Sequence, residues 1–179
     1  MEQMTFLDFF AGIGGFRKGF ELCGMRCVGH CEIDKYADRS YRAIHDVKED
    51  EWYAADITKV APADLPRADL WAGGFPCQDY SIMKKNSAGI KGTKGALWWQ
   101  IDDILREKRP KYVLLENVDR LIRSPAKQFG RDFSIILRCL YEKGYAVEWR
   151  VINAADYGYA QRRRRTFIVA YHNQTEIFC

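Results

Sequence analysis

The feature that most constrains this chain of 179 residues is the alternation of short apolar, β-prone runs with stretches that have the length and apolar spacing of helices. Strands are expected at residues 5–10, 26–32, 52–55, 69–73, 112–115, 146–152 and 166–171. Helices are expected at residues 14–23, 35–45, 96–107 and 129–143. Alternation of this kind is typical of an α/β fold with a mainly parallel sheet and helices on both faces. Because ligands bind beyond the carboxyl ends of the strands in such sheets, the residues there are the first site candidates.

Length and composition predict one globular domain over residues 1–179. Hydrophobic residues make up 47% and charged residues 29%, and the net charge of +4 is compatible with a polyanionic partner. No apolar run approaches the roughly 18 residues that span a bilayer, and the first residues carry no secretory signal. We therefore expect an intracellular protein, cytoplasmic if bacterial or phage and nuclear if eukaryotic, with no membrane association.

The glycine-rich turn at residues 11–15 (Ala-Gly-Ile-Gly-Gly) lies between the first predicted strand and the first predicted helix. Such a turn brings backbone N–H groups and the positive end of the helix against a cofactor. Arg17 occupies the last glycine position of a G-x-G-x-x-G pattern, which weakens a dinucleotide interpretation. Glu32 follows Gly12 by twenty residues and ends the second strand, where an acid can accept hydrogen bonds from ribose hydroxyls or can simply be solvated.

Two further strand ends, and the segment before the last strand, carry polar or charged side chains. Asp56 and Ile57 end the third strand, a natural place for an acid and an apolar residue to contact an adenine. Glu116 ends the fifth strand, again on the ligand side of the sheet. The four arginines at residues 162–165 form either a solvated surface or an anion-binding patch.

The fourth strand ends in residues 73–78, with the sequence Gly-Gly-Phe-Pro-Cys-Gln. Free cysteines are often buried, but a cysteine that follows a proline at a strand end is better placed for chemistry than for core packing, so Cys77 is a candidate nucleophile. Residues 79–95 form a polar segment without a clear period, and a loop of that length in a compact domain is expected to act as a mobile active-site lid.

The six cysteines are irregularly spaced and fit a reducing compartment, so we expect no disulfides. Cys23, Cys27 and Cys31 recur every four residues, a spacing that could align metal ligands on a helix. Gly24 and Gly29 interrupt that spacing, and the second half of the stretch has the pattern of a strand. We therefore expect no metal site.

Four of these segments, taken in order, resemble the motifs of the cytosine-C5 DNA methyltransferase family. The matching segments are DFFAGIGGF at residues 8–16, GFPCQ at 74–78, ENV at 116–118 and QRRRR at 161–165. The resemblance covers nearly the whole chain, and the order and spacing agree throughout. A lone Pro-Cys-Gln would be weak, whereas four motifs in this order are very specific.

The resemblance implies a Rossmann-like methyltransferase fold with an antiparallel C-terminal strand. It also implies S-adenosylmethionine as methyl donor, S-adenosylhomocysteine as product, and no metal. The residues that would line the cofactor are Phe10, Gly12, Ile13, Gly15, Glu32, Asp56, Ile57, Pro76 and Leu97.

In the chemistry that the resemblance implies, Cys77 adds to carbon 6 of a flipped-out cytosine in double-stranded DNA, so that carbon 5 can accept the methyl group. Glu116 would hydrogen-bond nitrogen 3 and the exocyclic amino group. Arg163 and Arg165 would clamp the carbonyl oxygen of the base, the phosphate and the active-site groups. The loop at residues 79–95 would close over the base, and its side chains available for phosphates are Ser81, Lys84 and Lys85.

Two departures from the family pattern bear on function. Arg164 stands where the family often has an acid, and the chain stops at Cys179, whereas family members continue with a target-recognition region and a segment that covers the cofactor. We therefore expect a fragment or truncated member, which could self-associate or use a partner chain. The main hypothesis is an enzyme domain that methylates cytosine in DNA, with its biological role, restriction-modification or another, left open. A non-catalytic regulatory protein and a cytosine methyltransferase acting on transfer RNA remain open alternatives.

Overall fold

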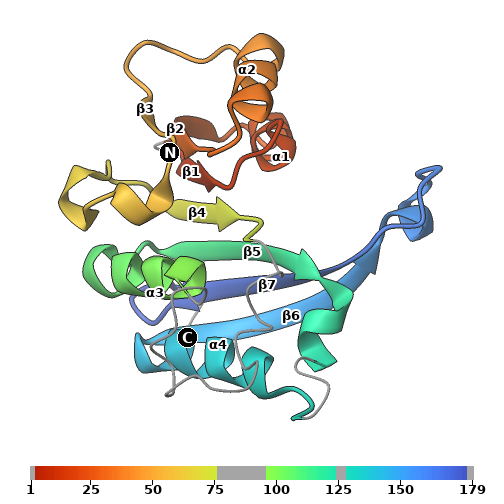
Figure 1. Cartoon of the computed structure of the whole chain (residues 1–179). Helices are drawn as coiled ribbons and strands as arrows, with labels where there is room; N and C mark the ends of the chain where they lie inside the picture. The colour runs from red at the N-terminus through yellow and green to blue at the C-terminus, as the bar shows by residue number, and fades with distance from the viewer. Residues whose placement is uncertain (1–2, 76–95, 124–127, 177–179) are drawn as a thin grey trace.

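The structure is a computed structural model that describes residues 3–75, 96–123 and 128–176. Within these residues seven strands form one sheet in the order β3-β2-β1-β4-β5-β7-β6 (Figure 1). The strands are β1 (Thr5–Phe9), β2 (Arg26–Cys31), β3 (Trp52–Ala54), β4 (Leu70–Gly73), β5 (Tyr112–Val118), β6 (Tyr145–Asn153) and β7 (Arg164–His172). Neighbouring strands from β3 to β5 are parallel, while β7 runs antiparallel to both β5 and β6. The predicted mainly parallel sheet with an antiparallel C-terminal strand is confirmed.

The helices divide between the two faces of the sheet. They are α1 (Gly15–Leu22), α2 (Lys35–Ile44), α3 (Ala96–Lys108) and α4 (Arg131–Glu142). The larger core cluster packs α3 and α4 against one face, and a smaller cluster packs α1 against the other. On this second face α2 stacks Tyr41 on His30 of β2, with ring centroids 4.1 Å apart. Among the described residues, no helix has the length and apolarity that crossing a membrane requires.

The sheet order reverses beside β1, whose neighbours are β2 on one side and β4 on the other. Every residue of β4 is buried, as expected for a central parallel strand covered on both faces. The carboxyl ends of β1 and β4 therefore meet at a switch point of strand order, which is where open α/β sheets bind ligands.

One strand boundary differs from the prediction in a way that affects the site. The sequence places Glu116 just beyond a strand that ends at residue 115, but β5 continues to Val118. The extension arises because β7 keeps pairing with β5 as far as the register Val118↔Arg165. Glu116 is thus held inside the sheet rather than on a loop.

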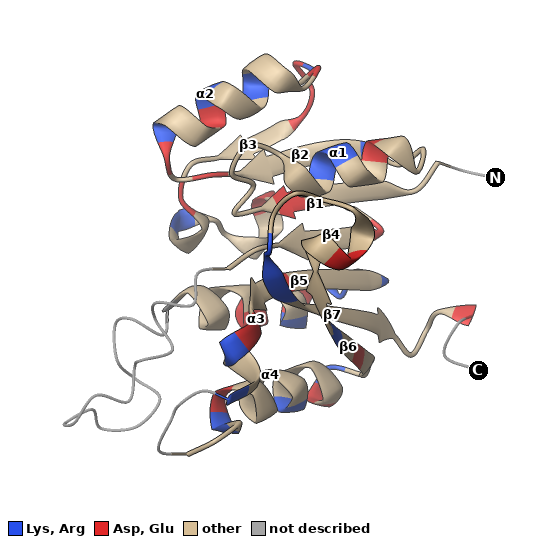
Figure 2. Ribbon diagram, turned by 90° about the vertical axis from the view of Figure 1, so that its right-hand side faces the viewer, with Lys and Arg blue, Asp and Glu red and all other residues tan. Residues whose placement is uncertain are grey.

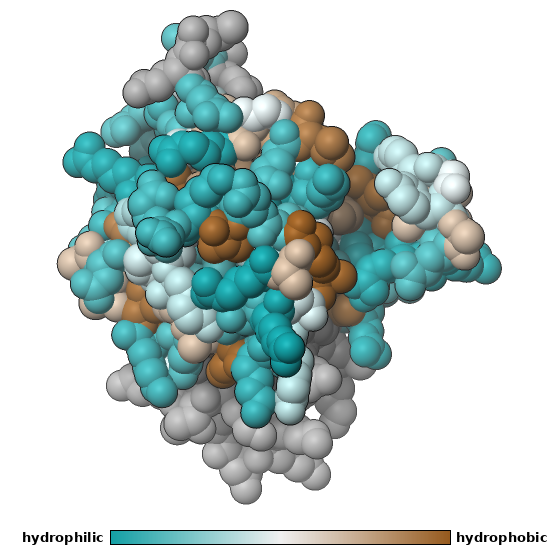
Figure 3. All heavy atoms as spheres, turned by 90° about the horizontal axis from the view of Figure 1, so that it is seen from above, coloured by the Kyte–Doolittle hydropathy of each residue, from teal (hydrophilic) through white to brown (hydrophobic). Residues whose placement is uncertain are grey.

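The connection between β6 and β7 projects from the body of the protein, as Figures 1 and 3 show from two directions. We call residues 154–163 the arm; it begins with a short 3-10 helix, η6 (Ala154–Tyr157). Tyr157 and Tyr159 on the arm are largely exposed. The arginine run that leads from the arm into β7 is drawn in Figure 2 as a continuous blue segment. The arm therefore brings positive charge to the end of the sheet at which the carboxyl end of β5 lies.

Candidate active site

The glycine-rich turn lies directly at the carboxyl end of β1. Phe10, Gly12 and Gly14 all have positive φ angles, of 54°, 56° and 87°. Such a sequence of left-handed residues needs glycine at most positions, because a Cβ strains this backbone conformation. A Cβ added at Gly12 or Gly15 would meet no atom within 4 Å, so the backbone there is open to a ligand. Ile13, between them, is 60% exposed.

Glu32, the predicted ribose ligand, follows β2 and faces the turn. Its Oε2 accepts a hydrogen bond from the Gly12 N–H at 2.7 Å, and its Oε1 accepts one from the Asp34 N–H at 2.8 Å. The carboxylate is therefore fixed by two backbone donors that belong to different elements. The predicted convergence of Gly12 and Glu32 at one edge of the sheet is present in the structure.

Asp56 and Ile57 follow β3, the edge strand beside β2. Asp56 caps the 3-10 helix η1 (Ile57–Lys59) and accepts hydrogen bonds from the Thr58 hydroxyl at 2.7 Å and from its N–H at 3.0 Å, which lower the pKa of the Asp56 carboxyl. Ile57 is buried and lines an apolar pocket. Phe10 lines the same pocket, and Leu97 of α3 packs against the adjoining core.

The last described residues before the predicted nucleophile are Gly74 and Phe75. The predictions for Pro76, Cys77 and the segment at residues 79–95, with Ser81, Lys84 and Lys85, lie outside the described residues. The Phe75 ring is buried against that of Trp98, with centroids 5.8 Å apart. These contacts fix the chain two residues before the predicted nucleophile.

Asn117 is a site residue that the sequence interpretation did not single out. Its side chain is buried, and its Nδ2 donates to the Phe75 carbonyl oxygen at 2.9 Å. Its Oδ1 accepts from the Val118 N–H at 2.8 Å, so both ends of the amide are used. A polar residue inside an apolar strand pattern was the available signal, because buried amides are almost always hydrogen-bonded to something specific.

Glu116 and Arg165 form the central charged contact of the site. Arg165 Nε lies 2.7 Å from Glu116 Oε1, and a terminal nitrogen of Arg163 lies 4.0 Å from the same oxygen. A Cβ on Gly74 would come within 3.2 Å of Glu116 Oε2, so the absence of a side chain there leaves room for this carboxylate. The structure thus brings Glu116, Arg163 and Arg165 together beside the end of β4, as predicted.

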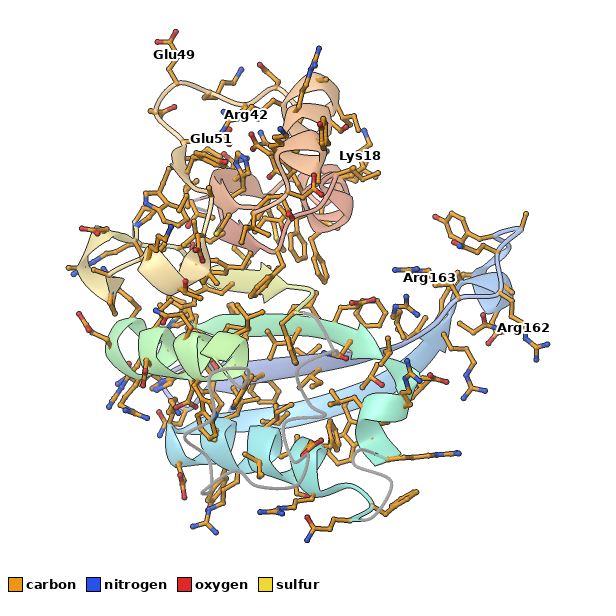
Figure 4. All side chains as sticks on the ribbon, viewed as in Figure 1. Lys18, Arg42, Glu49, Glu51, Arg162 and Arg163 are labelled. Carbon is orange, nitrogen blue, oxygen red and sulfur yellow. The ribbon has the colours of Figure 1, made fainter. Side chains whose placement is uncertain are left out.

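Arg164 has a separate partner. Its Nε lies 3.3 Å from Asp119 Oδ2, away from Glu116. Side chains alternate between the two faces along β7, so Arg164 points opposite to Arg165. In Figure 4 Arg163 points from the arm back toward the body, whereas Arg162 points away from it. The alternation explains why an additional arginine at position 164 leaves the Glu116 contact intact.

The described cysteines are all free, and two of them are buried in the sheet. Burial raises the pKa of the Cys27 thiol to about 11 and that of Cys31 to about 12, which makes both poor nucleophiles. Over residues 3–75, 96–123 and 128–176, no group of three or more His, Cys, Asp or Glu side chains could hold a metal ion.

The sheet order and the site at its switch point define a Rossmann-like methyltransferase fold. The model of the C-5 cytosine-specific DNA methylase family matches residues 4–178, and the chain belongs to that family. The resemblance read from the four sequence motifs is therefore confirmed.

Named relatives and solved structures agree with this assignment. The Type II methyltransferase M.Sau3AI of Staphylococcus aureus is 45% identical in an alignment that covers 96% of this chain and 44% of that protein. M.NgoBI of Neisseria gonorrhoeae is 40% identical, over 96% of this chain and 52% of its own length. The Dnmt2 methyltransferase of S. pombe has the same fold, with a TM-score of 0.78 at 19% identity over 97% of this chain and 52% of that one. The chain spans about half the length of the curated relatives it matches.

Proposed function

We propose that this chain carries the cofactor-binding and catalytic residues of an enzyme that methylates carbon 5 of cytosine in double-stranded DNA. The observation that carries the proposal is the placement of Glu116, held by Arg165, beside Gly74 on the same rim of the sheet as the glycine turn and Glu32. A methyl donor on one side of this rim and a base on the other would face each other. A protein that only binds DNA does not need that arrangement.

The residues at the turn fit S-adenosylmethionine, which would supply an electrophilic methyl group when bound. Gly12 and Gly15 expose backbone without an obstructing atom, and Glu32, held by the Gly12 N–H, would accept hydrogen bonds from ribose hydroxyls. The apolar pocket beside Phe10 and Ile57 suits the flat face of an adenine. S-adenosylhomocysteine should bind in the same way, because it differs only at the sulfur.

The reacting cytosine would be held by the charged contact on β5 and β7. Cys77 as thiolate forms a bond to carbon 6, and the electron pair of the 5,6 double bond becomes available at carbon 5. Glu116, carrying a proton that it shares with nitrogen 3, donates to that nitrogen and accepts from the exocyclic amino group. Arg165 fixes one carboxyl oxygen, so that the other faces the β4 side. After carbon 5 has gained the methyl group, a base removes its proton, and the bond from Cys77 to carbon 6 breaks.

Neighbouring residues would prepare these groups before the base arrives. Asn117 fixes the Phe75 carbonyl, and so the approach of the chain to Cys77, while Arg163 is near enough to Glu116 to add a second positive charge. Target choice would depend on parts of the longer relatives that this chain does not match, either in the same polypeptide or in a partner chain. Self-association stays a prediction from the sequence.

Covalent trapping tests the proposal. The full-length protein is incubated with S-adenosylmethionine and duplex DNA of mixed sequence in which cytosine is replaced by 5-fluorocytosine, since fluorine at carbon 5 cannot leave as a proton does. A covalent protein–DNA adduct should form, should vanish in Cys77→Ser, and should persist in the control Cys23→Ser, whose thiol is exposed. Cofactor binding without an adduct on any DNA would contradict the proposal. Transfer RNA in the same assay separates the RNA alternative.

A further inference from the structure

The ring of His45 lies directly against the glycine turn. Its Nε2 is 3.1 Å from the Ile13 carbonyl oxygen, and a Cβ on Gly14 would lie 2.1 Å from the same nitrogen. The side chain is only 3% exposed. Because a carbonyl oxygen can only accept, Nε2 must carry the proton in this contact. The contact therefore fixes the position of the ring and requires an N–H at Nε2.

This contact fixes one peptide unit of the turn at both ends. The Ile13 carbonyl and the Gly14 N–H belong to the same planar peptide, and that N–H donates to the Ala11 carbonyl oxygen at 2.8 Å. With His45 on the carbonyl and Ala11 on the N–H, the peptide plane cannot rotate without breaking two hydrogen bonds. The orientation of the plane sets the φ angle of 87° at Gly14, and hence the direction of the chain into α1.

The position of His45 is itself determined by the end of α2. His45 is the C-cap residue, and its backbone N–H donates to the Tyr41 carbonyl oxygen at 2.9 Å. Its other ring nitrogen, Nδ1, faces Glu21 Oε2 at 3.8 Å. The ring is thus oriented from α2 through the backbone and from α1 through a carboxylate.

Arg17 connects α1 to the segment that follows His45. Its guanidinium donates to Glu21 at 2.7 Å, to both carboxyl oxygens of Glu51 at 2.7 and 3.0 Å, and to the Asp46 carbonyl oxygen at 3.1 Å. Glu51, labelled in Figure 4, lies on the segment between α2 and β3. Arg17 is almost completely buried, and a buried charge is tolerated only when it is paired and hydrogen-bonded in this way.

We propose that His45 is a positioning residue for the cofactor turn, and that Arg17 holds the segment carrying it. This inference rests on the proposed function, because it takes the turn to be the S-adenosylmethionine site. By fixing the Ile13–Gly14 peptide in advance, His45 removes an ordering cost that the cofactor would otherwise meet on binding. The proposal also explains why arginine occupies the position of the third glycine of the dinucleotide pattern. The Arg17 side chain lies over the Tyr41 ring of α2 and hydrogen-bonds the segment that follows this helix.

Two amide variants test the role of the ring nitrogen. In His45→Gln the side-chain N–H can still reach the Ile13 carbonyl, whereas in His45→Asn the amide is one methylene shorter and falls short of it. Both place a polar amide in the same buried site, so their effects on folding are matched. A role in core packing alone would change the melting temperature of both variants and leave the difference between them in cofactor affinity small.

The experiment is a calorimetric titration of each purified variant with S-adenosylhomocysteine, together with its melting temperature. His45→Asn should bind about tenfold more weakly than the wild type, and His45→Gln should stay within about threefold of it. Gly14→Ala should also weaken binding at least about tenfold, because its Cβ would collide with the ring, whereas Gly19→Ala on α1, where a Cβ meets nothing, should not.

Equal affinity of the Asn and Gln variants would overturn the positioning role, and so would unchanged binding by Gly14→Ala. Wild-type protein that fails to bind S-adenosylhomocysteine would overturn the proposed cofactor site itself, and this inference with it. The two failures are distinguishable because only the second involves the wild type.

Discussion

The two sides of the site are built in different ways. On the side that we propose for the cofactor, backbone groups of the glycine turn are fixed by Glu32, by His45 and by buried contacts around Arg17. On the base side, three half-solvated side chains meet: the Glu116 side chain is 20% exposed, that of Arg165 25% and that of Arg163 49%. The side proposed for the cofactor is thus preformed. The side proposed for the base consists of side chains whose interactions would strengthen when a substrate excludes water.

Removing the Glu116 carboxylate should have the largest effect on methyl transfer. It should leave binding at the proposed cofactor turn unchanged. Glu116→Gln keeps the shape of the side chain but changes its charge and donor pattern at nitrogen 3. We expect methyl transfer to fall by about 10² to 10⁴, the range typical of a positioned acid or base. Single-turnover transfer of labelled methyl groups to DNA measures it.

The matched control is Glu148→Gln on β6, which β7 separates from β5 in the sheet. The Glu148 carboxylate accepts a hydrogen bond from the Tyr171 hydroxyl at 3.1 Å. It should retain nearly full transfer. Comparable losses in both variants would show that negative charge on this sheet matters in general, and that Glu116 has no special role.

Arg165→Lys tests whether the contact between Arg165 and Glu116 depends on the shape of the guanidinium as well as on its charge. Lysine keeps the positive charge but lacks the planar, multi-donor head that contacts Glu116 at 2.7 Å. We expect transfer to fall by about 10- to 100-fold, corresponding to about 1.4 to 2.7 kcal/mol. Arg164→Lys, on the opposite face of β7 and paired with Asp119, should change it less than about twofold. Equal effects of the two substitutions would contradict the assignment of faces.

Asp8 in β1 is a fully buried carboxyl, and its protonation should make the stability of the protein depend on pH. Burial raises the pKa of this carboxyl well above its usual range, with the Arg17 backbone N–H and charge opposing the shift. The folded protein therefore holds a proton that the unfolded chain releases near pH 4, so the free energy of unfolding should fall as pH rises above that value. The slope should approach, at most, about 1.4 kcal/mol per pH unit in this window.

Urea unfolding at several pH values from 4.5 upward measures this slope. Asp8→Asn cannot ionise, so the decline should be reduced by the contribution of one group, and the variant should gain stability relative to the wild type as pH rises. An identical pH dependence of the unfolding free energy in both proteins would mean that the pKa of Asp8 is the same in the folded and the unfolded state.

Much of the cofactor side could be predicted from the sequence because its signals are local. A glycine-rich turn after an apolar run, and an acid twenty residues later at a strand end, follow from how one strand, one turn and one helix connect. The structure places Gly12 and Glu32 in direct contact, as that pattern indicates.

The residues that the sequence did not identify depend on contacts between distant segments. His45 contacts Ile13 across 32 positions, and Asn117 contacts Phe75 across 42. Glu116 was expected beyond its strand because no local signal shows that β7 will extend the pairing to Val118. Such contacts are set by tertiary packing, on which a single sequence carries little direct information.

The most direct test of the difference between the two sides is the binding of S-adenosylhomocysteine to Glu32→Gln and Glu116→Gln, measured side by side by calorimetry. Glu32→Gln should bind about tenfold more weakly, about 1.4 kcal/mol, because it loses an acceptor shared by the turn and the ribose. Glu116→Gln should bind as the wild type does. Equal weakening in both variants, or unchanged binding in Glu32→Gln, would contradict the account.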